Sequence, residues 1–337
     1  MKVLVNGVGN IGTTLLQVLS THRDLLGIDE VLAHKSTVRP WDVPQLERLK
    51  DSGVVLVGDA YTAQATLDQV AHDIDYVFDA GRNGFGIERR SLYETFPRLL
   101  GASAQGTETT FGTPYVLGLG MDASAQRWTH IPSCNTHSAL AVLRTLTDGD
   151  LDDVAFGDFV VARRSEDVGN HERLVAGNVV ARHLDPVLGT HHAIDADKVL
   201  AVLGRRLPIQ SSDITTPSQF LHSTRFSLRL RSAPSASEVR DRIARSSYVT
   251  STQVFDTNKV FEIGRRFGLG GRLFNQAIFV ADNLLVNDDL VSGWAMVPQE
   301  GNTILSTCAA FLQRSCGVTE AEVRTAALAE KLLIGPL

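Results

Sequence analysis

Short apolar runs alternate with stretches of helical spacing along the first third of the chain. An apolar run at 2–6 precedes a segment in which Ile11, Leu15 and Leu19 recur at the spacing of a buried helix face. Further runs predict strands at 29–34 and 53–58, and helices at 43–51 and 89–100. The segment 67–81 predicts a helix in its first half and a strand in its second half. This order of strands and helices predicts a parallel sheet that is covered by helices on both faces.

After residue 134 the pattern changes to longer runs that are typical of strands. Within 224–232, Phe226, Leu228 and Leu230 alternate with arginine and serine, which gives one buried face and one solvated face. Similar runs predict strands at 155–163, 275–288 and 291–297, and helical spacing recurs at 135–148 and 319–333. We therefore predict an α/β protein, in which a doubly wound parallel sheet is followed by a second, α+β domain with a largely antiparallel sheet. The expected boundaries are 1–133 for the first domain, 134–305 for the second, and 306–337 for C-terminal helices that pack back on the first.

Three glycines follow the first predicted strand directly. Gly7, Gly9 and Gly12 form the pattern GxGxxG at the start of a predicted helix. In a dinucleotide-binding (Rossmann) turn, the first glycine permits a tight turn, the second lets the backbone approach a pyrophosphate, and the third lets the helix pack closely. The helix N-terminus then offers N–H donors to the phosphates. The alternative is a glycine-rich turn without a ligand.

The residues after the second predicted strand bear on the choice of cofactor. An NAD site usually has an acidic residue there, which binds the ribose 2′-hydroxyl. This chain has Lys35, Ser36 and Thr37 instead, which are donors that suit a 2′-phosphate. We therefore expect NADP, or the use of both cofactors, rather than strict use of NAD. The alternative is that Lys35 is a solvated loop lysine.

The chain contains three cysteines, Cys134, Cys308 and Cys316, whose spacing predicts neither a disulfide framework nor a zinc site. Cys134 falls at the predicted start of the helix within 135–148. A thiolate in that position is stabilised by the helix dipole and by free N–H groups, which lowers the pKa of the thiol and makes it a candidate nucleophile. We expect Cys308 and Cys316 to be ordinary buried thiols.

The composition, with 43% hydrophobic and 21% charged residues, is that of a globular protein, and the net charge is −6. The acidic balance argues against nucleic-acid or membrane-surface binding, which normally requires a basic excess. We see no secretory signal and no apolar run near the roughly 20 residues that span a bilayer. Together with the few cysteines, these features predict a protein of the reducing cytoplasm.

Seven short segments occur in an order that resembles the archaeal-type (class II) glyceraldehyde-3-phosphate dehydrogenases, of which this chain would be a distant member. They are GVGNIG at 7–12, AQGTE at 104–108, SCNT at 133–136, ARR at 162–164, THH at 190–192, PSQFLH at 217–222 and PQE at 298–300. The resemblance implies an NAD(P)-dependent phosphorylating aldehyde dehydrogenase of glycolysis. It also implies a homotetramer, with a small phosphorylated aldehyde and inorganic phosphate as partners.

The resemblance also implies roles for individual residues. Cys134 would attack the aldehyde and carry a thiohemiacetal and then a thioester, which phosphate would release as an acyl phosphate. Asn135 would help to bind the oxyanion. The matching cofactor positions are Asn10, Ile11, Gly106 and Gln299, and the matching substrate or phosphate positions are Ser133, Arg163, Arg164, His191 and His192. Because His191 and His192 have no acidic or cysteine neighbour in the sequence, we expect no metal site.

The chain departs from the family pattern around the general base. The family has two histidines separated by one residue, where this chain has His222 and Thr224. Both side chains would lie on one face of a strand. A second departure is His137, which lies three residues after Cys134 and therefore on the same side of a helix. We expect His137 or His222 to supply the base.

Other functions stay open at this point. The same chemistry on another small aldehyde, semialdehyde or acyl phosphate is one. Oxidation to the free acid without phosphate is another. A dinucleotide-binding sensor without catalysis is a third, although such a sensor has no need of a thiol at a helix start.

Overall fold

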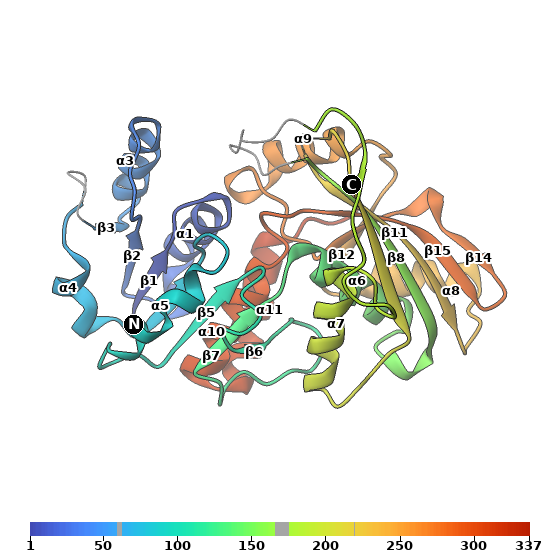
Figure 1. The fold of residues 1–337 in the computed structure, drawn as a ribbon, viewed down its shortest axis with the longest axis horizontal. Coiled ribbons are helices and arrows are strands. Elements are labelled where there is room, and N and C mark those ends of the chain that lie inside the picture. Colours follow the sequence, from blue (N-terminus) through green and yellow to red (C-terminus); the bar gives the residue numbers. More distant parts are fainter. Residues whose placement is uncertain (59–62, 166–174, 219) are drawn as a thin grey trace. The chain divides into compact units, whose positions relative to one another are not determined.

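The computed structural model describes residues 1–58, 63–165, 175–218 and 220–337 (Figure 1). The chain divides into two compact units. The first comprises 1–117, 122–132 and 304–331, and the second comprises 118–121, 133–303 and 332–337.

The first unit is built on a seven-stranded sheet in the order β3-β2-β1-β4-β5-β7-β6. Every described pairing in this sheet is parallel. The strands are β1 (Lys2–Asn6), β2 (Glu30–His34), β3 (Val55–Val57), β4 (Tyr76–Asp79), β5 (Gly101–Gln105), β6 (Thr113–Pro114) and β7 (Trp128–Ile131). The predicted parallel, doubly wound sheet is therefore confirmed, and its order reverses beside β1, where such sheets bind their ligands.

The helices of the first unit are α1 (Asn10–Thr21), α2 (Arg23–Leu26), α3 (Val43–Asp51), α4 (Leu67–Val70), α5 (Phe85–Glu94), α10 (Ile304–Cys316) and α11 (Val318–Leu332). The helix expected at 89–100 begins earlier, at Phe85, and ends at Glu94 before Pro97, because a proline disfavours helix at the residue before it. Helix α10 packs on strands β5 and β7.

The second unit contains an eight-stranded mixed sheet in the order β12-β13-β15-β11-β8-β10-β9, with β14 paired to β15. The pairings β8–β10 and β12–β13 are parallel, and the other described pairings are antiparallel, as predicted for most of this sheet. The strands are β8 (Val154–Arg163), β9 (Val179–Val180), β10 (Ile209–Thr215), β11 (His222–Leu230), β12 (Val249–Thr252), β13 (Ala277–Val280), β14 (Leu285–Asn287) and β15 (Leu290–Val297). The run at 275–288 thus forms two strands rather than one.

The helices of the described part of the second unit are α6 (Cys134–Leu146), α7 (His191–Val202), α8 (Ala236–Arg245) and α9 (Thr257–Phe267). Helix α6 packs against strands β8, β11, β13 and β15 and against α7. Its side chains from Asn135 to Leu143 are all buried, so this part of the helix is covered on every side. Single turns of 3-10 helix lie at Pro40–Asp42, Ala71–Asp73, Leu151–Asp153, Leu269–Gly271 and Ala281–Asn283.

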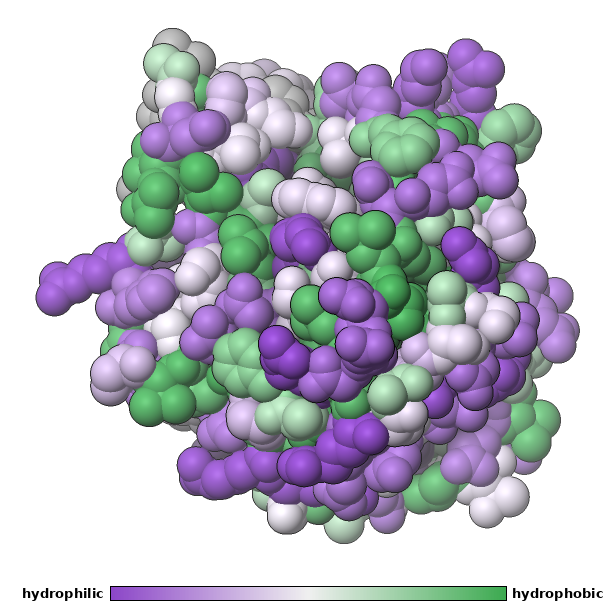
Figure 2. Space-filling view, turned by 90° about the vertical axis from the view of Figure 1, so that its right-hand side faces the viewer, coloured by the Kyte–Doolittle hydropathy of each residue, from purple (hydrophilic) through white to green (hydrophobic). Residues whose placement is uncertain are grey.

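The surface that faces the viewer in Figure 2 mixes polar residues with separate groups of apolar ones. Such interspersed apolar groups are ordinary on a folded protein. Among the described residues, no helix combines the length and the apolar character that crossing a bilayer requires.

Candidate functional site

The glycine turn lies between β1 and α1, in the first unit. Gly7 has φ +98°, and a Cβ added there would lie 2.6 Å from the Ala80 carbonyl oxygen. A Cβ on Gly12 would lie 1.9 Å from the Gly7 carbonyl oxygen. Packing therefore requires glycine at both positions. Asn10 and Ile11 form the first turn of α1.

Gly9 differs from the other two glycines of this turn. It has an ordinary extended backbone with φ −101°. Within the described residues, no atom lies within 4 Å of a Cβ built on Gly9. Nothing in the fold itself requires a glycine here, so the open space is what a closely approaching ligand would need.

Lys35 follows strand β2 and turns back toward the glycine turn. Its Nζ donates to the Val8 carbonyl oxygen at 3.1 Å, and it lies 3.6 Å from Asp42 Oδ2. The side chain is 23% exposed, so Lys35 is not a freely solvated lysine. Asp42, which the sequence pattern did not single out, offsets part of its charge. Ser36 and Thr37 are exposed.

A small pocket opens beside Lys35 at the ends of β2 and β3. It is lined by Ala33, Lys35, Val38, Leu46, Leu56, Val57 and Ala63. This wall is apolar except for the lysine. The choice between NADP and NAD stays a prediction.

A buried polar network joins the carboxyl ends of β1, β2 and β4, and it was missed from the sequence. Asn6 Nδ2 donates to Asp79 Oδ2 at 2.9 Å, and His34 Nδ1 donates to Asn6 Oδ1 at 2.6 Å. The Tyr93 hydroxyl also donates to Asp79. Burial, and then the charge of Asp79, raises the pKa of Tyr93, so the phenol stays protonated. The signal in the sequence was a polar residue that closes each apolar strand.

Gly106 follows β5 at the same edge of the sheet. It has φ +76°, and a Cβ there would meet no described atom within 4 Å. Its carbonyl oxygen accepts a hydrogen bond from His130 Nε2 at 2.7 Å. Position 106 therefore requires glycine for its backbone conformation, and the space beside this turn is open.

Cys134 is the first residue of α6, in the second unit. Ser133 is the N-cap residue, and its hydroxyl accepts from the Thr136 N–H at 3.4 Å. The thiol is partly exposed at the positive end of the helix, where a thiolate is favoured. Cys308 is buried, and burial raises the pKa of its thiol to about 12. The expectation for Cys316 is wrong, because the end of α10 leaves that thiol exposed.

Two amides lie close to Cys134 in the chain or in space. Asn302 Nδ2 donates to the Cys134 carbonyl oxygen at 2.9 Å and to the Gln276 carbonyl oxygen at 3.1 Å. Asn302 thus holds the backbone of Cys134, a role that no motif in the sequence indicated. Asn135, expected to help bind the oxyanion, is 4% exposed, and its Oδ1 has no partner among the described residues.

The two candidate histidines have opposite tautomers. His137 is fully buried, and its Nδ1–H donates to the Ser133 carbonyl oxygen at 3.2 Å, which leaves Nε2 as an acceptor. His222 Nδ1 accepts the Arg164 backbone N–H at 2.8 Å, which places the proton of the neutral ring on Nε2. Burial, followed by the charges of Arg164 and Arg163, lowers the pKa of His222 well below its ordinary value. His222 is therefore a hydrogen-bond donor at Nε2 and not a base there.

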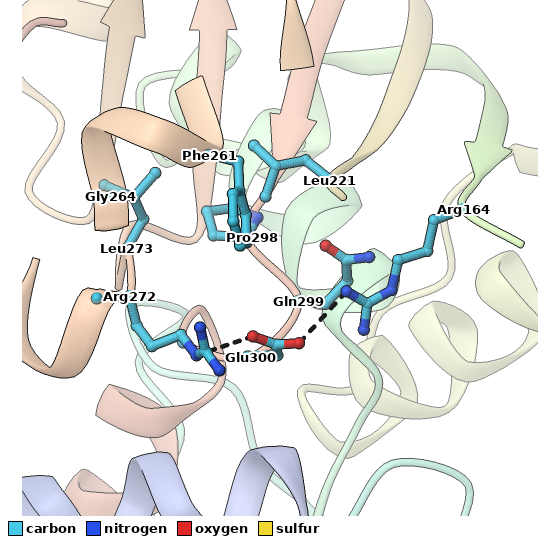
Figure 3. Close-up of a pocket in the computed structure, with 11 residues that line it drawn as sticks. Arg164, Leu221, Phe261, Gly264, Arg272, Leu273, Pro298, Gln299 and Glu300 are labelled. Atoms are coloured by element: carbon cyan, nitrogen blue, oxygen red, sulfur yellow. Dashed lines mark hydrogen bonds and ion pairs between the residues drawn. The ribbon is translucent and has the colours of Figure 1, made fainter. Parts of the chain in front are cut away.

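Arg164 lies in a buried ion cluster rather than at a free anion site (Figure 3). Its Nη1 lies 3.3 Å from Glu300 Oε1, and Glu300 Oε2 lies 2.8 Å from Arg272 Nε. Gln299 Nε2 donates to the Phe220 carbonyl oxygen at 3.0 Å. Arg164, Arg272, Gln299 and Glu300 form the polar side of a pocket whose apolar side includes Leu221, Phe261, Leu273 and Pro298.

The histidine pair begins helix α7. The rings of His191 and His192 have centroids 3.9 Å apart. His192 Nε2 lies 3.5 Å from Asp213 Oδ2, and Arg163 Nη1 lies 3.8 Å from Asp213 Oδ1. The fold thus brings three of the five expected substrate or phosphate residues together, and it adds a carboxylate from β10.

The charges of this group set its protonation. Burial, followed by His192 and Arg163, lowers the pKa of His191 to about 4, so its ring is neutral near pH 7. Burial raises the pKa of Asp213, but His192 and Arg163 outweigh it, and the pKa is lowered overall. The result is two histidine rings against an ionised carboxylate.

Comparison with known proteins finds distant relatives that all carry the same name. No family model matches the chain. A glyceraldehyde-3-phosphate dehydrogenase of Saccharolobus islandicus is 24% identical over 239 residues, which are 66% of this chain and 64% of the relative. Enzymes of the same name from Sulfolobus acidocaldarius and Metallosphaera sedula are 22% and 21% identical, over 85% and 89% of this chain and 84% and 88% of theirs.

The chain thus spans somewhat less than two thirds of the length of the Saccharolobus islandicus relative. All three relatives carry the name of an oxidoreductase. Membership of class II stays a prediction. The protein is a distant relative of archaeal glyceraldehyde-3-phosphate dehydrogenases.

Proposed function

We propose that the protein is an NAD(P)-dependent phosphorylating aldehyde dehydrogenase that acts on glyceraldehyde 3-phosphate. The observation that carries this proposal is Cys134, a partly exposed thiol on the first residue of a helix whose backbone is held by Asn302. The open space at Gly9 and the distant relatives support it.

Cys134 carries the reacting group in this mechanism. Its thiolate, favoured by the N-terminus of α6, adds to the aldehyde carbon and forms a thiohemiacetal. The adduct is oxidised to a thioester, which inorganic phosphate cleaves to an acyl phosphate and the free thiolate. A nicotinamide dinucleotide, when bound, supplies the hydride acceptor. Gly7, Gly9 and Gly12 would hold its pyrophosphate at the start of α1.

The two histidines would divide the proton chemistry according to their tautomers. His222 would donate a hydrogen bond from Nε2 to the oxygen of the adduct. His137 would accept a proton at Nε2. Replacing each by asparagine separately and measuring hydride transfer tests this division, and full activity in both variants would contradict it.

The reaction itself is tested with a panel of small aldehydes, with NADP and NAD, and with and without inorganic phosphate. We expect reduced cofactor to form with glyceraldehyde 3-phosphate only when phosphate or arsenate is present. Cys134→Ser should abolish turnover, and the matched control Cys316→Ser should retain it. Turnover that persists without phosphate would indicate oxidation to the free acid, and its complete absence with every aldehyde would contradict the proposal.

Thiol labelling separates an enzyme from a sensor without any substrate. In a Cys316→Ser background, iodoacetamide should modify Cys134 rapidly and Cys308 slowly, because Cys308 is buried and the pKa of its thiol is about 12. Equal and slow modification of both thiols would favour a dinucleotide-binding protein without catalysis.

A second candidate is the same chemistry on an aldehyde that carries less negative charge. The structure favours it in one respect, because Glu300 engages Arg164 and Asp213 faces Arg163 and His192. Two carboxylates thus oppose the cations that were expected to bind the substrate phosphate. Faster turnover of an uncharged small aldehyde than of glyceraldehyde 3-phosphate would make this candidate the better one.

A further inference from the structure

The starting point is a buried cluster of His191, His192 and Asp213 in the second unit. One nitrogen of each ring and one carboxylate oxygen lie within 4.8 Å of one another. His192 and Asp213 are each only 2% exposed. Among the described residues, neither ring nitrogen of His192 and neither oxygen of Asp213 has a hydrogen-bond partner.

Such unpaired groups are costly inside a protein. A buried polar group without a partner costs about 1–3 kcal/mol, and more when it is charged. His192 Nε2 and Asp213 Oδ2 lie 3.5 Å apart, yet they do not form a hydrogen bond. These four atoms make no hydrogen bond to any described residue, and the oxygens of Asp213 have only the longer ion pairs to His192 and Arg163, so they point to a bound group that would satisfy them.

The backbone holds this cluster in place through Ser211. The Thr190 N–H donates to the Ser211 carbonyl oxygen at 2.9 Å, and the Ala193 N–H donates to Ser211 Oγ at 3.0 Å. Ser211 and Asp213 lie two residues apart on β10 and are both buried, so they share a face of the strand. The first turn of α7 is thus fixed against the strand that carries Asp213.

The chemistry of the cluster suits a cation better than an anion. The Asp213 carboxylate repels phosphate, and a phosphate would offer its oxygens no partner, whereas a cation can bind carboxylate oxygens and ring nitrogens together. Two imidazoles and one carboxylate are instead a common ligand set for zinc and other divalent transition ions, and they are poor ligands for magnesium. The side chain of Arg163, whose Nη1 lies 3.8 Å from Asp213 Oδ1, is 40% exposed and therefore reaches solvent beside the cluster.

We propose that His191, His192 and Asp213 bind a divalent transition metal ion such as Zn²⁺. Ligands at zinc distances of about 2.0–2.2 Å in a tetrahedral site lie about 3.4 Å from one another. His192 and Asp213 already lie 3.5 Å apart, and His191, the least buried of the three, turns inward to complete the set. The fourth position is open to water or to an oxygen ligand. This inference does not rest on the proposed function.

The test is metal binding by the full chain in a Cys134→Ser, Cys316→Ser background, because exposed thiols also bind zinc. After treatment with a chelator, Zn²⁺ is titrated by calorimetry, and Co²⁺ is titrated by its visible absorption. Asp213→Asn and His191→Asn should each weaken binding by at least about tenfold. The matched control is His72→Asn, since His72 Nε2 and Asp73 Oδ2 also lie 3.5 Å apart but are exposed. It should leave binding unchanged.

Circular dichroism and thermal unfolding of the metal-free variants establish that they are folded. If Asp213→Asn does not fold, His191→Asn carries the test, because that side chain is partly exposed. Saturable Zn²⁺ binding that both variants weaken supports the site, as does an intense visible Co²⁺ band that they abolish. Binding equal in the parent and in His191→Asn overturns it. Stabilisation by inorganic phosphate alone, increased by Asp213→Asn, also overturns it and identifies an anion site.

Discussion

Replacing Gly9 by alanine should weaken dinucleotide binding without harming the fold. The Gly9 backbone, with φ −101°, is one that alanine adopts readily, and the added Cβ would meet no described atom within 4 Å. A Gly→Ala change at such a position stabilises a protein by about 0.4–1 kcal/mol, because the unfolded chain loses freedom. We therefore expect an unchanged or slightly higher melting temperature.

The effect on binding follows from the proposed approach of the pyrophosphate to this backbone. A Cβ at Gly9 would push the phosphates away from the N–H groups of α1, and a hydrogen bond to a charged group contributes about 1.5–3 kcal/mol. Loss of one such bond raises Kd by about 10-fold to 150-fold. Gly12→Ala is the contrasting variant, since its Cβ would lie 1.9 Å from the Gly7 carbonyl oxygen. It should destabilise the first unit by about 1–3 kcal/mol or more.

The assay pairs thermal unfolding with calorimetric titration of NADP and NAD into the wild-type, Gly9→Ala and Gly12→Ala proteins. The expected pattern is a stable Gly9→Ala protein with weak binding and an unstable Gly12→Ala protein. A Gly9→Ala protein that binds both cofactors with wild-type affinity would refute the reasoning, because the open space would then have no ligand.

Three further predictions concern single side chains. Lys35→Ala should raise the Kd of NADP and leave that of NAD unchanged, which titration of both cofactors measures. Glu300→Gln should lower the free energy of unfolding in urea by about 3–5 kcal/mol, because it leaves the buried Arg164 without its partner. Glu262→Gln, in an exposed ion pair, should change that free energy little. His191 has its ordinary pKa of 6.5 in the unfolded chain, but a pKa of about 4 in the folded chain. Stability should therefore fall as the pH falls from 6.5 toward 4, and His191→Asn in metal-free buffer should flatten that slope.

The local features of this protein were predictable because neighbours in the sequence determine them. The strand at 2–6, the glycine turn and the helix that begins at Cys134 each follow from apolar spacing and from a glycine or a serine at the right position. The parallel sheet followed from the order of these elements. The buried thiol of Cys308 followed from its apolar surroundings, but Cys316 did not, because only the folded chain shows that α10 ends there.

The partners of the site residues were not predictable, because they come from distant segments. Asp213 reaches the histidine pair only when β10 runs beside the start of α7. Glu300 meets Arg164 across more than a hundred residues of chain, and Asn302 meets Cys134 in the same way. The tautomer of His222 depends on one backbone N–H on a neighbouring strand. Such contacts depend on strand register and tertiary packing, which apolar spacing alone does not specify.

Arg164 is held at both ends, since its backbone N–H donates to His222 and its guanidinium pairs with Glu300. Loss of the Glu300 charge would leave the Arg164 guanidinium buried without its carboxylate, whereas loss of the Arg164 charge would leave Glu300 paired with Arg272. We therefore expect a neutral residue at 300 to be accompanied by a neutral residue at 164 among related sequences. A family alignment in which arginine at 164 is retained without an acid at 300 would be unexpected. The pair would then mark how far a relative has diverged in this part of the second unit.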